Sequence, residues 1–176
     1  MKYRRIFLDG YSYFITLVTY RRTPLLIKNI DLLRQAFRLS KEKYNYSIDA
    51  IVVLPDHLHM ILTPEKAAEY PKIITHIKRS FVYALDLQTK TIAKIKVTTS
   101  KYNRKHSGIW QDRYYEHTIR NEKDYGIKLD YIHYNPVKHG LAEYAAEWRY
   151  SSFEKFVKKG IYDRNWGDFD IDIDFE

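Results

Sequence analysis

Two short apolar segments separated by a Pro-Asp pair place the strongest limit on how this chain can fold. Residues 48–54, IDAIVVL, and residues 57–63, HLHMILT, are rich in β-branched and other apolar side chains, and each has the length of an ordinary strand. Pro55 and Asp56 between them are residues that favour a turn. The pattern therefore predicts two strands joined by a turn.

The remaining elements follow from the same kind of pattern. Strands are predicted over residues 11–20 and 114–119, and helices over residues 29–44, 71–87 and 122–134. Residues 88–109 carry many Lys, Thr and Ser without a clear period, which indicates a long loop. The order is typical of an α+β fold, a ferredoxin- or RRM-like sandwich in which helices pack on a central, mostly antiparallel sheet of four to five strands.

Charge divides the chain into a basic body and an acidic end. The 176 residues fit a single domain over residues 1–167, followed by an acidic tail over residues 168–176, DFDIDIDFE. The whole chain has a net charge of +8, and because five acids lie in the tail, the body alone carries +13. A basic body in a chain with 17 tyrosines is typical of a protein that binds a polyanion and stacks on bases, although a merely solvated surface is the alternative. We hypothesise that the tail competes with the polyanion for this surface; a disordered end and an added edge strand are the alternatives.

Composition also excludes several kinds of site. The chain has no cysteine, so it has no disulfide, no cysteine zinc site and no thiol nucleophile, which is compatible with a reducing cytoplasm. The first twenty residues lack the apolar core of a signal peptide, and no run reaches the roughly 18 apolar residues of a membrane span. We therefore expect a soluble, cytoplasmic protein without a membrane partner.

Two histidines in the second apolar segment need a chemical explanation. Alternate side chains of a strand share a face, so His57 and His59 point to one side, while Leu58, Met60 and Leu62 fill the core on the other. The Cα atoms of the two histidines are about 6.6 Å apart in a strand, which allows both rings to reach one ion. Such a pair is suited to a metal, and hydrogen-bonded structural histidines are the alternative.

The last predicted helix offers two further polar candidates. Tyr125, Leu129 and Ile132 form a plausible core stripe at spacings of four and three residues. Tyr131 lies about 100° round the helix from Ile132, away from that stripe, and Asn135 follows one turn later on the same face as Tyr131. A phenol and a carboxamide one turn apart suit a nucleophile and a metal ligand better than they suit a core.

Three motifs, in order, connect these residues to a known family: LPDHLHMIL, WQDRYYEHTIR and DYGIKLDYIHYNPVKHGL. Together with HIKRSF and WRYSSF, they resemble the REP-associated tyrosine transposases, the single-tyrosine branch of the HUH endonucleases. The similarity runs from about residue 3 to residue 166. It implies the HUH endonuclease fold and a transposase-like enzyme that cleaves single-stranded DNA beside palindromic hairpins, the repetitive extragenic palindromes, and rejoins it.

The resemblance also assigns roles to individual positions. His57 and His59 fall on the paired metal ligands, Asn135 falls on a third polar ligand, and Tyr131 falls on the catalytic tyrosine. The metal is Mg²⁺ or Mn²⁺ in such enzymes, and the products are a 5′-phosphotyrosine and a free 3′-hydroxyl. Related transposases act as dimers, and nothing in this sequence decides between a homodimer and a monomer.

Basic and aromatic side chains are the predicted contacts to single-stranded hairpin DNA. Tyr114 and Tyr115 fall in the strand before the last predicted helix and are either structural or directed at DNA. The predicted phosphate-binding cations are Arg4, Arg5, Arg21, Arg22, Lys78, Arg79, Lys101, Arg104, Lys105, Arg113 and Arg120.

Other function classes stay open at the level of sequence. RNA-binding modules that stack bases on a sheet share the predicted plan, but they require neither the histidine pair nor Tyr131. A metal-dependent nuclease would use the histidines with water as the nucleophile and would form no covalent adduct. A catalytically silent relative would bind hairpins without cutting them.

Overall fold

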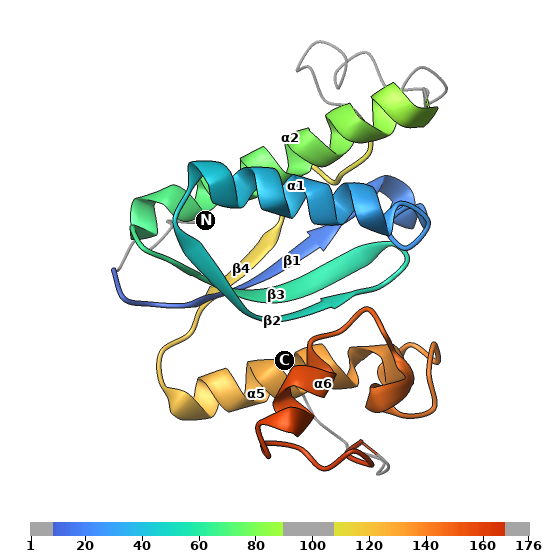
Figure 1. Ribbon diagram of the computed structural model, residues 1–176. Helices are drawn as coiled ribbons and strands as arrows, with labels where there is room; N and C mark the ends of the chain where they lie inside the picture. Colours follow the sequence, from blue (N-terminus) through green and yellow to red (C-terminus); the bar gives the residue numbers. More distant parts are fainter. Residues whose placement is uncertain (1–8, 90–107, 168–176) are drawn as a thin grey trace.

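Four antiparallel strands form the centre of the protein (Figure 1). The computed structural model describes residues 9–89 and 108–167, so the predicted long loop and the acidic tail lie largely or wholly outside the described residues. The strands are β1 (Tyr13–Val18), β2 (Tyr46–Val53), β3 (His57–Pro64) and β4 (Tyr115–Thr118). Their order across the sheet is β2-β3-β1-β4, and every pairing is antiparallel. The α+β sandwich is confirmed, with four strands.

Helices cover both faces of this sheet (Figure 1). One face carries α1 (Ile30–Lys43) and α2 (Tyr70–Thr89), and the other carries α5 (Glu122–Lys138) and α6 (Phe153–Lys158). Short 3-10 helices cover Tyr20–Arg22, Ala67–Glu69 and Ala145–Glu147. The expectation that the histidine side of β3 lies opposite the packed face is wrong in one respect, because α5 packs on that side as well.

Alternation along β3 divides its side chains between two cores. Leu58, Met60 and Leu62 are fully buried with Ile77 and Phe81 of α2, as the pattern predicts. Burying each such side chain contributes about 1.5–3 kcal/mol. The same alternation turns His57, His59 and Ile61 toward α5. The position of the histidines is therefore a consequence of the larger core on the other side.

The second core fixes α5 against the sheet. Leu129 and Ile132 of α5 pack with Phe14 of β1, Ile61 of β3 and Phe153 of α6. These helix residues are the predicted core stripe, which is confirmed. Because that stripe faces the sheet, the neighbouring helix face, which carries Tyr131, lies at the edge of the interface beside the histidines.

The C-terminal end of α5 differs from the prediction. The helix was expected to end near Tyr134, but it continues through Pro136 to Lys138. Asn135 and Pro136 are both buried, so packing on the sheet holds this last turn in place although a proline removes one backbone hydrogen bond. Gly140, at φ +64°, then turns the chain away from the helix. The extra turn brings Asn135 into a regular helical position.

Residues 150–152 cover the outer edge of β2. The Val53 amide donates to the Tyr150 carbonyl at 2.8 Å, and the Ser152 amide donates to the Ile51 carbonyl at 2.8 Å. The Trp148 indole N–H donates to the Val53 carbonyl at 2.9 Å. An exposed strand edge invites pairing with other chains, so this segment protects the sheet.

The same C-terminal segment also holds α5. Ser152 Oγ lies 2.9 Å from His133 Nε2, and the Tyr162 hydroxyl donates to Asp130 Oδ1 at 2.6 Å. Asp130 and His133 flank Tyr131 in sequence, so both bonds restrain the helix on either side of that residue. No element was predicted beyond residue 140, and the motif WRYSSF gave no helical period from which α6 would follow.

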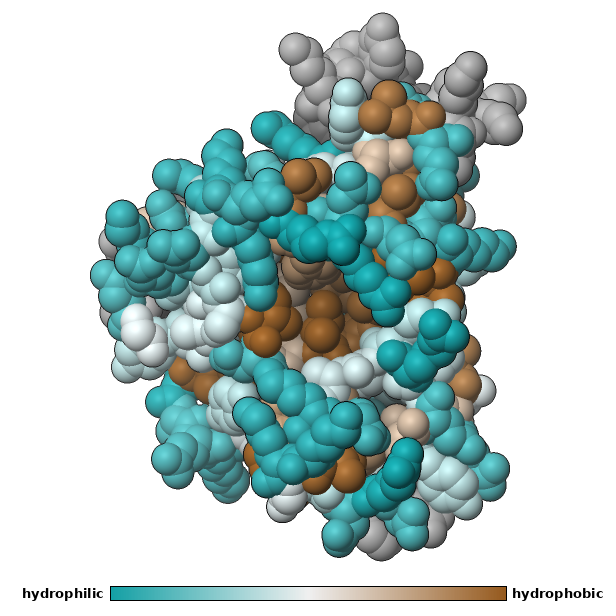
Figure 2. Space-filling model, viewed as in Figure 1, coloured by the Kyte–Doolittle hydropathy of each residue, from teal (hydrophilic) through white to brown (hydrophobic). Residues whose placement is uncertain are grey.

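One surface view shows where the fold is hollowed. Figure 2 shows mostly hydrophilic side chains, with a recess near the centre whose floor is apolar. A cavity of about 210 Å³ lies between α1, β2 and residues 149–152, and a larger groove of about 550 Å³ lies between α1 and α2. In the described part of the chain, no helix is long and apolar enough to cross a bilayer.

We expect stability to fall in mild acid because of His133. Burial among Phe153, Phe156 and Tyr162 lowers the pKa of His133 to about 3, against about 6.5 in an unfolded chain. The folded state therefore binds a proton on His133 more weakly than the unfolded state does. The stabilisation of the folded state by neutral His133 is complete above pH 6.5 and is lost as pH falls toward 3. This single group lowers the free energy of unfolding by up to about 1.4 kcal/mol per pH unit. Urea unfolding at pH 7.5 and at pH 5 measures how much the free energy of unfolding changes with pH. His133→Gln should show a smaller change than the wild type. An equal change in both proteins would contradict the attribution to His133.

Candidate active site

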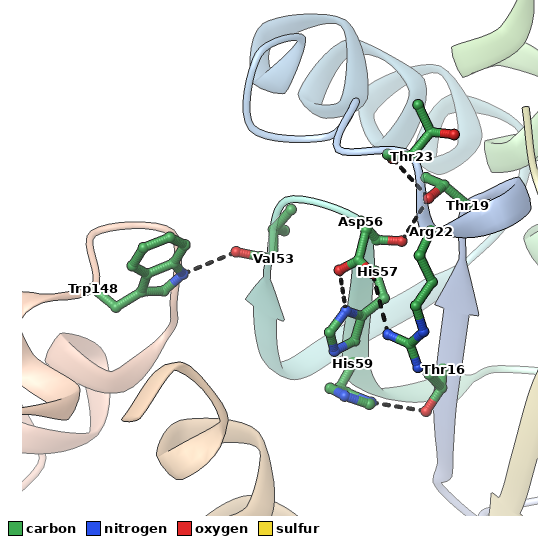
Figure 3. A network of polar contacts seen from close by, with 9 residues as sticks. All are labelled: Thr16, Thr19, Arg22, Thr23, Val53, Asp56, His57, His59 and Trp148. Atoms are coloured by element: carbon green, nitrogen blue, oxygen red, sulfur yellow. Dashed lines mark hydrogen bonds and ion pairs between the residues drawn. The ribbon is translucent and has the colours of Figure 1, made fainter. Parts of the chain in front are cut away.

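The histidine pair lies in the centre of the sheet, beneath α5. His57 and His59 are only 5% and 4% exposed, and their ring centroids are 5.0 Å apart. His59 Nδ1 lies 2.8 Å from Thr16 Oγ1, and His57 Nδ1 lies 2.6 Å from Asp56 Oδ1 (Figure 3). Because a carboxylate only accepts, His57 carries a proton on Nδ1, which it donates to Asp56. Thr16 and Asp56 thus orient both rings.

Asp56 connects the histidine pair to Arg22. One carboxylate oxygen accepts from His57, and the other accepts from an Arg22 guanidinium nitrogen at 3.1 Å (Figure 3). Partial burial opposes ionisation of Asp56, but the bonds and charges of His57 and Arg22 outweigh it and lower its pKa. Sequence reasoning treated Asp56 only as a turn residue. The available signal was a carboxylate immediately before the first histidine.

The turn that carries Arg22 has an unusual backbone. Arg21 and Arg22 are consecutive residues with φ of 54° and 51°, in the left-handed region that favours glycine. Thr19 Oγ1 holds the turn by donating to the Thr23 carbonyl at 2.8 Å and to the Asp56 carbonyl at 2.9 Å (Figure 3). Such backbone costs about 1–3 kcal/mol for each residue and persists where the surroundings enforce it. Here it brings the Arg22 side chain to Asp56.

Tyr131 lies on α5 directly beside the pair. Its ring centroid is 5.0 Å from that of His59 and 5.7 Å from that of Phe14, and both contacts are edge-to-face. Lys138 Nζ lies 5.3 Å from the centre of the Tyr131 ring. The structure thus brings the predicted nucleophile and the predicted histidine ligands together from segments about 70 residues apart in sequence.

Asn135 occupies the same helix face between two residues that contact the pair. Tyr131 precedes it by one turn, and His139, whose ring lies 5.1 Å from that of His57, follows it by one turn. Asn135 is fully buried, and both polar atoms of its side chain lack a hydrogen-bond partner among the described residues. A buried amide without partners costs about 1–3 kcal/mol, so its presence at this position needs an explanation.

His59 presents a neutral ring nitrogen to the site. His59 Nε2 is also buried and has no partner in the described structure. Burial, and then the charge of His57, lower the pKa of His59 well below its usual value, so the ring is neutral at pH 7, as a metal ligand must be. Among the described residues, no group of three His, Cys, Asp or Glu side chains could hold a metal ion. His59 Nε2 and the Asn135 amide are thus among the buried polar atoms that lack a partner in the described structure.

The predicted DNA-binding cations are spread over the molecule. Arg21 and Arg22 lie in the turn beside the histidines, and Arg113 and Arg120 are exposed on either side of β4. Lys78 and Arg79 are on α2, across the sheet from the pair, where Lys78 Nζ donates to the Gln111 carbonyl at 2.9 Å. The remaining predicted cations, Arg4, Arg5, Lys101, Arg104 and Lys105, lie outside the described residues. Lys128, whose Nζ lies 5.4 Å from the centre of the Phe14 ring, was not predicted.

Comparison with known proteins agrees with this geometry. Residues 8–135 match the family described as "Transposase IS200 like". The chain is 41% identical to a Haemophilus influenzae protein assigned to the REP-associated tyrosine transposases, over 94% of this chain and 92% of that protein. It is 35% identical to the REP-associated tyrosine transposase of Escherichia coli K12, over 94% of this chain and 90% of that one. The chain belongs to the REP-associated tyrosine transposases.

A solved structure from the same family extends the agreement to three dimensions. It is described as a REP-associated tyrosine transposase bound to a REP hairpin, and it superposes with a TM-score of 0.78 at 34% sequence identity. The match covers 94% of this chain and 90% of that chain. The HUH endonuclease fold implied by the motifs is therefore confirmed for this REP-associated tyrosine transposase.

Proposed function

We propose that this protein is a single-stranded DNA endonuclease and strand transferase that acts at palindromic hairpin DNA through Tyr131. The observation that carries the proposal is the placement of the Tyr131 ring against a buried pair of oriented histidines, with the partnerless Asn135 amide one turn away. The family supports it, and a structural relative is described with a REP hairpin bound. The RNA-binding alternative explains neither the histidines nor Asn135.

His57, His59 and Asn135 would hold a divalent cation. A bound ion polarises a non-bridging phosphate oxygen and orients the phosphodiester for attack. Imidazole nitrogens suit Mn²⁺ better than Mg²⁺, which prefers oxygen ligands, so we propose Mn²⁺ or Mg²⁺ with the former bound more tightly. Asp56 and Thr16 contact Nδ1 of the two rings, so Nε2 of each would be the ligating atom.

Tyr131 then performs the transesterification. Its Oη forms a bond to phosphorus, the bond from phosphorus to the 3′ oxygen breaks, and that oxygen takes up a proton to become a 3′-hydroxyl. The phenolic proton passes to solvent, and the 5′ phosphate stays on Tyr131. Because the new phosphotyrosine is still a diester, another 3′-hydroxyl can attack it and reseal the strand without ATP. The positive charges of Lys138, beside the Tyr131 ring, and of Arg22, beside Asp56, would attract the phosphate.

The test is direct detection of the covalent intermediate. Wild-type protein is incubated with 3′-labelled single-stranded oligonucleotides that contain palindromes from the source genome, with Mn²⁺ or with EDTA. Denaturing gels are expected to show a heat-stable, metal-dependent adduct, and peptide mass spectrometry should place the nucleotide on Tyr131. Cleavage without an adduct would replace the proposal with hydrolysis by water, and hairpin binding without cleavage would indicate a catalytically silent protein.

Replacing Asp56 by Asn should weaken metal binding without unfolding the protein. The variant loses the carboxylate that orients His57 and anchors Arg22, and loss of such a partner typically costs about 10- to 100-fold in metal affinity. Calorimetric titration with Mn²⁺ measures the change. Asp31→Asn is the matched control, because Asp31 forms only an exposed pair with Arg34 on α1, and it should bind metal as the wild type does. Unchanged affinity in Asp56→Asn would refute the orienting role.

A further inference from the structure

One exposed aromatic side chain lies on the histidine face of the sheet. Tyr115 of the edge strand β4 is opposite Thr16 of β1, which is in turn opposite His59 of β3. Residues directly opposite in antiparallel strands share a face, so Tyr115, Thr16 and His59 form one row across the sheet. His59 is buried and Thr16 is half-buried, whereas Tyr115 is 56% exposed. Its ring is therefore accessible beside a site that is otherwise under α5.

The distance from this ring to the site is short. Neighbouring strands lie about 4.8 Å apart, so two steps separate the Cα atoms of Tyr115 and His59 by roughly 10 Å. The Phe14 ring fills the gap, at 6.2 Å from the Tyr115 ring and 5.7 Å from the Tyr131 ring. An aromatic row thus leads from the nucleophile to the edge of the sheet, within reach of a base close to the scissile phosphate.

Positive charge borders this row along α5. Lys128, Tyr131 and Lys138 are separated by three and seven residues and so share a helix face. Lys128 Nζ lies 5.4 Å from the Phe14 ring, and Lys138 Nζ lies 5.3 Å from the Tyr131 ring. Surfaces that bind single-stranded DNA combine cations with aromatic rings, because the cations attract the phosphates and the bases stack on the rings.

We propose that Tyr115 stacks against an unpaired base beside the scissile phosphodiester, and that this contact determines which bond lies next to Tyr131. This inference rests on the proposed function and adds a specificity-determining residue to it. A structural role does not account for the exposed ring, since Tyr115 belongs to neither core cluster. Stacking on the face of a phenol requires the ring and not the hydroxyl.

The test pairs protein variants with oligonucleotides in which a base is missing. Affinity is measured by fluorescence anisotropy in EDTA, with hairpin oligonucleotides that carry one abasic site at successive positions of the unpaired flank. Tyr115→Ala should bind the intact hairpin about 5- to 100-fold more weakly, and Tyr115→Phe should bind as the wild type does. An abasic site at one position should lower the affinity of the wild type by the same factor and leave the affinity of Tyr115→Ala unchanged. The reason is that the substitution and the missing base each remove the same stacking contact.

A second exposed tyrosine provides the control. Tyr83 is 67% exposed on α2, across the sheet from the site, and Tyr83→Ala should bind every oligonucleotide as the wild type does. The inference is overturned if every abasic position lowers the affinity of the wild type and of Tyr115→Ala by the same factor. It is also overturned if Tyr115→Phe loses as much affinity as Tyr115→Ala.

The two proposals can fail separately. Because anisotropy in EDTA requires no cleavage, it reports on stacking even if no covalent adduct is found. If the adduct forms on Tyr131 but the effects of Tyr115→Ala and the abasic sites simply add, only the inference on Tyr115 is refuted.

Discussion

Tyr131→Phe is expected to abolish covalent capture of DNA and to lower the strand-cleavage rate by roughly 10³-fold or more, as the loss of a nucleophile does in other enzymes. Phenylalanine keeps the ring that contacts His59 and Phe14, so the fold and the DNA affinity should be unchanged. Single-turnover cleavage of a labelled hairpin oligonucleotide measures the rate, and a denaturing gel follows the adduct.

A neighbouring tyrosine serves as the control for this substitution. Tyr134 is on the same helix, but its ring lies 6.4 Å from that of Trp166 in the C-terminal segment. Tyr134→Phe should therefore form the adduct at the wild-type rate. If Tyr131→Phe still forms an adduct, the nucleophile is another tyrosine, and Tyr125 and Tyr134 are then the residues to map.

Asn135→Leu should stabilise the protein while removing its metal affinity. Leucine has the same branched shape as asparagine, with larger terminal groups and no polar atoms, so it relieves the burial of an amide that has no partner in the described structure. We expect the free energy of unfolding to rise by about 1–3 kcal/mol. The same change removes the amide oxygen proposed as the third ligand. A gain in stability that accompanies a loss of function is typical of residues kept for activity.

Urea unfolding without metal and calorimetric titration with Mn²⁺ measure the two effects. The control is Asn29→Leu, since the Asn29 side chain donates to the Leu25 carbonyl at 2.8 Å and its loss should be destabilising. Destabilisation of Asn135→Leu by a similar amount would show that Asn135 has a structural role, and unchanged Mn²⁺ affinity would remove it from the proposed ligands.

The parts of the site that could be predicted from sequence depend on local periodicity. Alternation in β3 decides that Leu58 and Met60 face one core while His57 and His59 face the other side. The 3.6-residue period of α5 separates Tyr131 from the stripe of Leu129 and Ile132. Both patterns are set by backbone geometry within a few residues, so they hold whatever the remainder of the chain does. The resemblance to a known family then implied that the two segments belong together.

The parts that could not be predicted depend on contacts between distant segments. Thr16 meets His59 only because of the pairing register of β1 with β3, and no local pattern determines that register. Arg22 meets Asp56 through a turn with left-handed backbone at two arginines, which residue preferences argue against. The helical turn that contains Pro136 likewise exists because burial on the sheet outweighs local propensity.

The packing of α5 on the sheet of its own polypeptide would, under the proposed mechanism, limit how many DNA ends one molecule holds. Tyr131 and the histidines that it contacts come from the same chain, so each molecule supplies a complete set of the proposed catalytic groups with one attacking phenol. With Tyr131 as the proposed nucleophile, one chain would keep one strand end covalently attached at a time. Transfer of a DNA segment, which has two ends, would require either two molecules acting together or two successive reactions by one.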